Sequence, residues 1–172
     1  GSNELVALDS SGVVRERKTG GLAGFDRPFG LAALPDGTLF VSELNGDRLT
    51  RIAPDGAVKL IGGKGRGPGS LIGPQHLAAD GEGSVYVVDY GNSRVSKFDS
   101  EGGYLLSFGE KAPETGFPGF ASPTGILERE GVVYVADSFR RAIYRFDPSG
   151  NYLGSLAEGG RAFLRRAGDG DG

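Results

Sequence analysis

The chain has 172 residues, no cysteine, and a formal net charge of −3 from 19 basic and 22 acidic side chains. This length supports one domain with its own core, the lack of cysteine excludes disulfides and thiolate chemistry, and the charge balance argues against binding to duplex nucleic acid or an anionic membrane. No apolar run approaches the roughly 20 residues that span a bilayer, and 32 glycines with 9 prolines predict many turns between short strands.

The first segment, residues 1–27, is predicted to hold one pair of strands and a connector. The stretch "LVALDSSG", residues 5–12, is an apolar strand that runs into a turn, and the Gly-rich "GGLAGFD" precedes the next strand. The chain opens with Gly1-Ser2 and contains no methionine. We expect that tag removal from an excised segment left these two residues, and that any native signal peptide is already gone.

Three longer segments repeat one pattern and are predicted to cover residues 28–73, 74–122 and 123–160. Each opens on a strand with a proline near its start, in "RPFGLAALPDGTLFV", "GPQHLAADGEGSVYVV" and "SPTGILEREGVVYVA". Each continues through "SELNGDRLTRI", "VDYGNSRVSKF" or "ADSFRRAIYRF" into a Gly-containing turn. The last residues of these stretches, Ile52, Phe98 and Phe146, lie 46 and 48 residues apart, and Leu8 ends a partial copy 44 residues earlier.

Each full copy has the pattern of four short strands. Apolar and polar residues alternate in "RVSKF" and "AIYRF", whereas "VYVV" is continuously apolar and therefore expected to be buried on both faces. Four strands in a period of about 40 to 50 residues are typical of a β-propeller, in which each sheet is one blade. The predicted fold is therefore all-β, with about three and a half blades built as four-stranded antiparallel sheets.

The strand count predicts an incomplete ring. The chain carries four copies of the outer strand pair but only three of the inner pair. Residues 161–172 contain no further strand pair and are expected to form a flexible, solvated tail. Because open blade faces leave apolar surface and unpaired edges, we expect either a piece of a longer propeller or the association of two chains into a ring.

The repeats resemble NHL repeats, which combine an apolar strand, an Asp, an Asn-x-Arg-Val motif and a lysine-aromatic pair. "VYVVDYGNSRVSKFDSEG", residues 85–102, matches this pattern nearly throughout, and the resemblance spans roughly residues 3–160. It implies a β-propeller with a binding or scaffolding role. It supplies no catalytic set, because fold and function are separate matters.

Positions that recur in every blade are predicted to maintain the blade. The carboxylate of Asp89 is expected to accept backbone N–H bonds in the adjoining turn or to pair with Arg94. The third copy departs from the pattern, with Arg140 in place of the repeat Asn and Ala142 in place of the repeat Arg. The structural set comprises Glu43, Arg48, Asp89, Asn92, Arg94 and Asp137.

The sequence predicts no catalytic residue, metal site or cofactor. His76 is the one histidine, so a zinc site with several histidines in a single chain is excluded. There is no G-x-S-x-G nucleophile motif, and "GGKGRGPGS" lacks the spacing of a phosphate-binding loop. His76 occupies the place of Gly30 and Gly125 at the start of an inner strand, either as a tolerated surface residue or as a contact in a ligand or peptide site.

The leading functional prediction is a non-catalytic scaffold that binds a protein, peptide or small ligand on its loop-bearing face. One alternative is part of a propeller enzyme of lyase or lactonase type, with its metal ligands in blades outside this chain. Another is an engineered or excised fragment that assembles into a ring. Single-stranded RNA binding would need more basic residues than Arg27, Arg66, Arg140 and Arg141. The predicted binding residues, which vary between blades, are Phe29, Gln75, His76, Tyr90, Phe139, Arg140 and Arg141.

Overall fold

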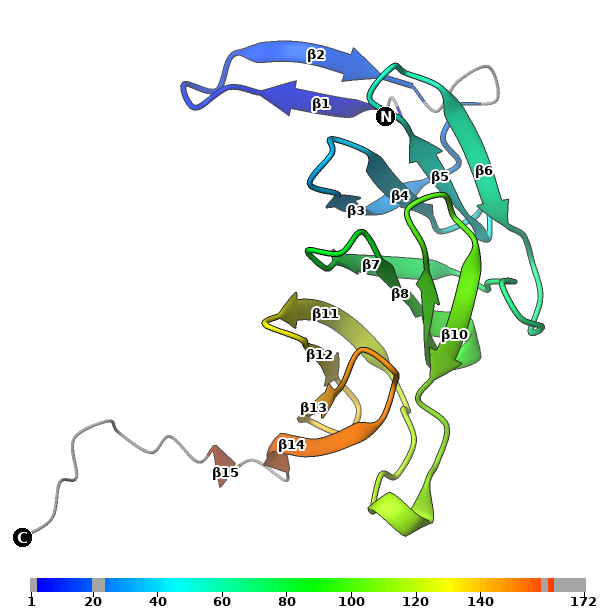
Figure 1. The fold of residues 1–172 in the computed structure, drawn as a ribbon, viewed down its shortest axis with the longest axis vertical. Coiled ribbons are helices and arrows are strands. Elements are labelled where there is room, and N and C mark those ends of the chain that lie inside the picture. The colour runs from blue at the N-terminus through cyan, green and yellow to red at the C-terminus, as the bar shows by residue number, and fades with distance from the viewer. Residues whose placement is uncertain (1–2, 20–23, 159–160, 163–172) are drawn as a thin grey trace, which may run out of the picture.

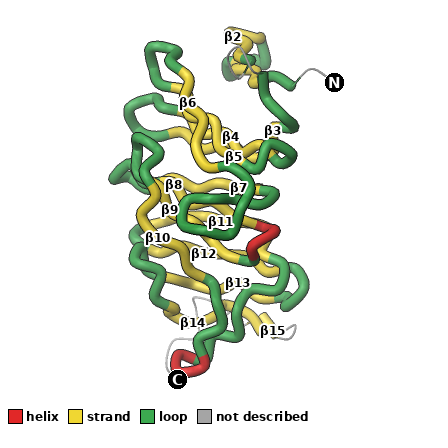
Figure 2. The backbone as a smooth tube through the Cα atoms, turned by 90° about the vertical axis from the view of Figure 1, so that its right-hand side faces the viewer, coloured by secondary structure: helices red, strands yellow, loops and turns green. Residues whose placement is uncertain are grey.

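The computed structural model describes residues 3–19, 24–158 and 161–162. It confirms an all-β fold, in which successive antiparallel sheets follow one another around an arc (Figure 1). The view turned by 90° shows the same sheets stacked one on the next (Figure 2). No helix within the described ranges has the length and apolar character of a membrane span.

The N-terminal sheet has two strands, and we call it the half-blade. It consists of β1 (Leu5–Leu8) and β2 (Val14–Lys18). Blade 1 has the strand order β3 (Pro28–Ala33), β4 (Leu39–Glu43), β5 (Arg48–Ile52) and β6 (Val58–Gly62). Blade 2 follows as β7 (Pro74–Ala79), β8 (Val85–Asp89), β9 (Arg94–Phe98) and β10 (Tyr104–Phe108).

Blade 3 has the same four strands and one addition. Its order is β11 (Pro123–Arg129), β12 (Val132–Asp137), β13 (Ala142–Phe146), β14 (Tyr152–Glu158) and β15 (Arg161–Ala162). Two short 3₁₀ turns lie in loops, η2 (Tyr90–Asn92) and η3 (Pro113–Thr115). Of the tail predicted over residues 161–172, all but β15 lies outside the described residues. The count of three blades and a half-blade confirms the predicted fold class.

The strand register places two different edges on every blade. In each blade the proline that opens the first strand pairs with the carboxylate that ends the second, as Pro28↔Glu43, Pro74↔Asp89 and Pro123↔Asp137. The connectors between blades reach the sheet at this edge, which we call the connector edge. The opposite edge carries the Asp- and Gly-rich turns, and we call it the turn edge.

The core lies between blades rather than within one. The first strands β3, β7 and β11 lie side by side along the inside of the arc (Figure 1). Phe40, Leu49 and Ile61 of blade 1 pack with Val85, Val87 and Phe98 of blade 2 in one apolar cluster. A second cluster joins Tyr86, Val95 and Phe108 of blade 2 to Val133, Val135 and Phe146 of blade 3.

Each blade therefore has a leading face, which contacts the following blade, and a trailing face, which contacts the preceding one. The leading positions are Phe40, Leu49 and Ile61 in blade 1 and Tyr86, Val95 and Phe108 in blade 2, all buried. The same repeat positions in blade 3 are Tyr134, Ile143 and Leu156, of which Ile143 and Leu156 are 39% and 47% exposed. Since burying such a side chain stabilises a fold by about 1.5–3 kcal/mol, a covered junction accounts for much of a blade's stability.

Candidate functional site

The carboxylate of Asp89 fastens the connector to blade 2. Its Oδ1 accepts a hydrogen bond from the backbone N–H of Ile72 at 2.8 Å, and its Oδ2 accepts from Asn92 Nδ2 and Arg94 Nε, both at 2.8 Å. Asp89 is fully buried, so these partners compensate for its lost hydration. The guanidinium of Arg94 continues to the connector and donates to the carbonyl of Ser70 at 2.7 Å. We call this arrangement the latch of blade 2.

The latch of blade 1 is built on a longer side chain. Glu43 Oε2 accepts from the backbone N–H of Asp26 at 2.6 Å and from Arg48 Nη2 at 2.9 Å, while Oε1 accepts from the hydroxyl of Thr50. Burial alone raises the pKa of Glu43, but the hydrogen bonds from Arg48, Thr50 and the Asp26 N–H outweigh it and lower the pKa below its ordinary value. The same ion pair raises the pKa of Arg48.

In the latch of blade 3, no Lys or Arg side chain among the described residues pairs with the carboxylate. Asp137 instead accepts from three backbone N–H groups, those of Ala121 at 2.7 Å, Ser122 at 3.2 Å and Arg140 at 3.0 Å. The side chain of Arg140 turns to the connector, where its Nε donates to the carbonyl of Gly119 at 2.7 Å. Arg140 therefore makes the connector contacts that Arg94 makes in blade 2.

All three latches share one partner that sequence reasoning did not identify. The connector N–H that reaches the carboxylate belongs to Asp26, Ile72 or Ala121, in each case two residues before the proline that opens the blade. Only the fixed offset of this residue from the proline signals it in the sequence. The remaining repeat residue, Asn92, also donates to the carbonyl of Gly65 in the connector at 2.9 Å.

His76 lies at the connector edge of β7 and contacts both neighbouring blades. Its ring and that of Phe29 from blade 1 meet edge to face, with centroids 5.2 Å apart and an interplanar angle of 84°. Its Nδ1 is 2.5 Å from the backbone carbonyl oxygen of Thr124 in blade 3. Because a carbonyl can only accept, we infer that Nδ1 donates in this contact, so that in the neutral tautomer the lone pair lies on Nε2.

Close packing of the backbones of β3 and β7 holds the residues of this site in place. Ser42 Oγ accepts from the N–H of Gly30 at 2.8 Å and donates to the carbonyl of Gln75 at 2.5 Å. A Cβ at Gly30 would lie 2.4 Å from that carbonyl oxygen, so only glycine lets β3 and β7 approach this closely. This close approach excludes a side chain at the repeat position in blade 1; in blade 3 a Cβ on Gly125 would meet only Cβ of Ala136, at 3.7 Å.

The other predicted binding residues lie on the same edge but do not join this cluster. Tyr90, 41% exposed in η2, accepts from the hydroxyl of Ser122 at 3.5 Å. Phe139 is 79% exposed in the loop between β12 and β13, next to Arg141 with its left-handed φ of 55°. The structure thus brings together Phe29 and His76, adds Thr124, which the sequence did not single out, and engages Arg140 in the latch of blade 3. A binding role for the whole set stays a prediction.

Comparison with family models decides what blade 2 is. Residues 71–98 match the NHL repeat. These residues are an NHL repeat. The match runs from the connector through the third strand of blade 2 and includes the latch residues Asp89, Asn92 and Arg94. The recognition of NHL repeats in the sequence is confirmed there.

Solved structures similar to this chain include two lyases and a protein complex. They include a catalytically inactive virginiamycin B lyase from Staphylococcus aureus with quinupristin, at 18% identity and a TM-score of 0.70, covering 93% of this chain and 50% of that one. A streptogramin B lyase follows at 19% identity, TM-score 0.70, covering 92% and 49%. A nidogen/laminin complex gives 18% identity, TM-score 0.66, covering 92% and 59%. The chain spans about half the length of the lyase structures.

The comparison with curated proteins gave no match. The propeller-blade fold is supported by the repeat in blade 2 and by the solved structures, and the role of the chain is argued from its own residues. Within residues 3–19, 24–158 and 161–162, no group of three or more His, Cys, Asp or Glu is arranged to hold a metal ion. The chemistry that the site offers is the aromatic ring of Phe29 and the second ring nitrogen, Nε2, of His76.

Proposed function

We propose that this NHL-type segment is a non-catalytic scaffold that binds a protein or peptide partner, or a small ligand, at the connector edge around His76. The observation that carries the proposal is the position of the imidazole, held between Phe29 of blade 1 and the Thr124 carbonyl of blade 3. A ring fixed by two neighbouring blades presents its Nε2 at a defined place, and a preorganised group costs less entropy when it binds.

The chemistry of this site favours a ligand that donates a hydrogen bond beside an apolar group. Phe29 is 47% exposed, so part of its ring remains available for an aromatic or aliphatic contact. The Nε2 of the neutral imidazole accepts one hydrogen bond, for example from a backbone N–H or a tryptophan or tyrosine side chain. Few polar groups next to apolar surface are typical of ligand sites on rigid folds.

The test is selection of random displayed peptides on the wild-type chain, followed by affinity measurement on variants. Peptides enriched on the wild type are expected to bind His76→Ala or Phe29→Ala at least about tenfold more weakly, which corresponds to losing one central contact. Glu82→Ala serves as the matched control, because Glu82 is exposed at the turn edge of the same blade. Equal binding to all three variants, or no enriched peptide, would overturn the proposal.

A second candidate is part of a propeller enzyme of the lyase type, with its remaining acid, base or metal ligands outside this chain. Its support is the hydrogen bond that fixes His76 by Nδ1, since histidines that ligate metals or move protons are commonly held this way through their other nitrogen. Quinupristin is the probe, and its consumption is followed by chromatography. Loss of quinupristin with the wild type but not with His76→Ala would favour this candidate.

A further inference from the structure

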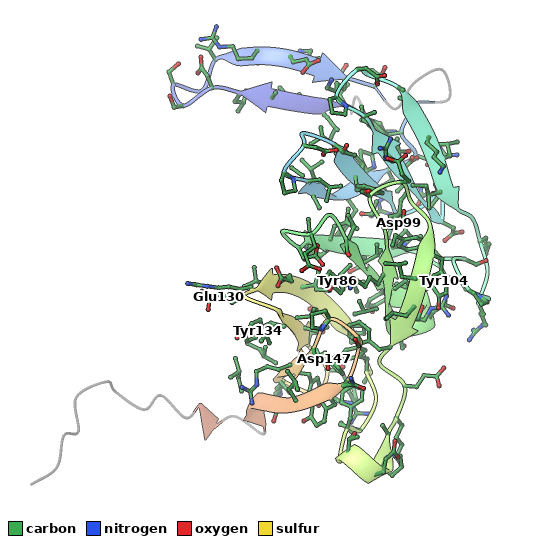
Figure 3. All side chains as sticks on the ribbon, viewed as in Figure 1. Tyr86, Asp99, Tyr104, Glu130, Tyr134 and Asp147 are labelled. Carbon is green, nitrogen blue, oxygen red and sulfur yellow. The ribbon has the colours of Figure 1, made fainter. Side chains whose placement is uncertain are left out.

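The leading face of blade 3 is an apolar surface that no further blade of the described residues covers. It forms a groove of about 470 Å³ lined by residues that include Leu127, Tyr134, Ile143 and Leu156. Figure 3 labels the two equivalent tyrosines: Tyr86 lies between blades 2 and 3, and Tyr134 lies on the open side of blade 3. The junctions between blades 1 and 2 and between blades 2 and 3 show which contacts a blade makes through this face, and so what kind of surface would bind it.

Both covered junctions share a cation that reaches the next blade. Arg51 of blade 1 donates through Nε to the carbonyl of Ser100 at 2.7 Å, in the β9–β10 turn of blade 2. Lys97, at the same repeat position in blade 2, donates to the carbonyl of Pro148 at 3.1 Å, in the β13–β14 turn of blade 3. Ser100 and Pro148 occupy the same position of their turns, two residues after the strand-ending aromatic. This contact therefore recurs at both junctions between full blades.

Blade 3 carries the donor of this contact without its acceptor. The repeat position is Arg145, whose Nη2 donates to the carbonyl of Leu153 within the blade at 3.3 Å. Its Nε is buried and has no hydrogen-bond partner among the described residues. A buried N–H without a partner is unfavourable, so Arg145 is a donor in need of an acceptor.

An apolar contact accompanies the cation at both covered junctions. A Cβ on Gly102 of blade 2 would lie 2.1 Å from Cδ1 of Ile61, and one on Gly150 of blade 3 would lie 2.8 Å from Cβ of Phe108. Each glycine thus lets the last strand of the preceding blade press on the turn. Phe108 also stacks against Phe146 with centroids 4.8 Å apart. Leu156 is the residue of blade 3 that corresponds to Ile61 and Phe108.

The half-blade carries the acceptor side of the same contact without its donor. Its turn has the geometry of the two acceptor turns, since Gly12, Gly102 and Gly150 have φ angles of 84°, 83° and 84°. Asp9 Oδ1 accepts from the N–H groups of Ser11 and Val13, as Asp99 and Asp147 do in their turns. No described residue lies within 4 Å of a Cβ on Gly12.

The trailing side of the half-blade is apolar and open as well. Leu8 stands at the repeat position of Phe98 and Phe146 and is 58% exposed, and Val6 on the same side is 43% exposed. The leading face of blade 3, which carries the donor Arg145, and the trailing side of the half-blade, which carries the acceptor turn, are therefore complementary: each has the polar partner and the apolar side chains that the other lacks. They lie at opposite ends of the described arc (Figure 1), so they do not meet within one copy of it.

We infer that the leading face of blade 3 binds the half-blade of a second copy of this chain, head to tail. In that junction Arg145 donates to the carbonyl of Ser10, Leu156 packs on Gly12 and Leu8, and Tyr134 and Ile143 are buried. The chain covers about half of the lyase propellers that it resembles, at 49% and 50%, so two copies supply the length of one such propeller. A contact of this kind joins different surfaces and closes when the rotation permits.

The first test is the absolute mass of the wild-type chain, by light scattering behind a sizing column over a concentration series. We expect a mass of about twice 17.9 kDa at high concentration. Ile143→Lys places a charge in the junction and should weaken the association by at least about tenfold. Leu105→Lys is the matched control, because Leu105 is 48% exposed on β10, away from this face, and should leave the association unchanged. A monomer at all concentrations, or equal effects of both variants, would overturn the inference.

The second test addresses orientation and uses the absence of cysteine from the chain. Leu8→Cys and Leu156→Cys are prepared as separate proteins, mixed and oxidised. Because the equivalent residues Phe146 and Phe108 are in contact, a disulfide between the two proteins is expected only in the mixture. Efficient cross-linking of Leu156→Cys with itself would mean a face-to-face pair and would contradict the head-to-tail junction. Neither test involves His76, so a failure here leaves the proposed binding role open.

Discussion

Blades 2 and 3 carry nearly the same side chains on their leading faces and expose them very differently. Tyr86 and Val95 are fully buried under blade 3, whereas at the same positions of blade 3 Tyr134 lines an open groove and Ile143 is 39% exposed. The comparison teaches that the repeat position decides which side chain is present, while the neighbouring blade decides what that side chain contributes to stability. Each prediction below tests one part of this difference.

The largest effect on the free energy of unfolding is expected for the two equivalent tyrosines, one buried and one on the open face. Tyr86→Ala empties a site that is 0% exposed and should lower the free energy of unfolding by about 3–5 kcal/mol. Tyr134→Ala removes the same side chain from the open face and should cost less than about 1 kcal/mol in the monomer. Chemical denaturation at low protein concentration measures both. Equal costs would mean that blade 3 is covered even in the monomer.

The second prediction compares the latches. Asp89→Ala leaves the Arg94 guanidinium and the Ile72 N–H without their buried carboxylate, which should cost about 3 kcal/mol. Asp137→Ala should cost about 1–3 kcal/mol, because it deprives only backbone N–H groups of a partner. A double-mutant cycle of Asp89→Ala with Arg94→Ala isolates the pair. A coupling energy near zero would show that Arg94 is held by the connector alone.

The third prediction separates the cost of backbone strain in a turn from the cost of steric overlap at a junction between blades. Gly102 and Gly56 have φ angles of 83° and 89° at the same repeat position, but only a Cβ on Gly102 would overlap Ile61. Gly56→Ala should therefore cost about 1 kcal/mol through backbone strain, and Gly102→Ala about 2 kcal/mol, since strain and overlap add. Thermal unfolding of the two variants gives the difference. The comparison fails if Gly56→Ala is the more destabilising.

The fourth prediction concerns two neighbouring arginines. Arg140→Ala removes hydrogen bonds to the carbonyls of Gly119 and Pro118 and should cost about 1 kcal/mol. Arg141 makes no such contact to the described part of the connector, so Arg141→Ala should stay within about 0.5 kcal/mol of the wild type. Both variants are measured by the same denaturation experiment. An unchanged Arg140→Ala would remove Arg140 from the latch of blade 3.

The smallest effect is a dependence on pH. The pKa of Glu43 is lowered on folding, so its stabilising contribution is complete above the ordinary value of 4.5 and is lost as the pH falls through the folded pKa. The stability difference between the wild type and Glu43→Gln should be largest near neutral pH and shrink as the pH falls below the ordinary pKa of 4.5. Denaturation at several pH values checks this. A difference that grows on acidification would contradict it.

The sequence predicts the blades well because their signals are local. Each strand and turn repeats at a fixed spacing, and Asp89 and Arg94 sit at facing positions of β8 and β9, so the pair follows from the motif. Contacts between blades leave no such pattern. The exchange of Arg94 for Arg140, two repeat positions earlier, and the Thr124 carbonyl beside His76 depend on how the connector and the next blade pack. These details could be found only in three dimensions.

The order of the strands has a consequence for how the chain acquires its structure. Every described sheet pairs strands that follow one another in the sequence, and each latch joins a blade to the connector just before it. Low sequence separation of contacts favours rapid folding. In a chain emerging from the ribosome, the strands of blade 1 can therefore pair while blade 3 is still being synthesised. The leading face of each folded blade is then available for the next blade to pack against.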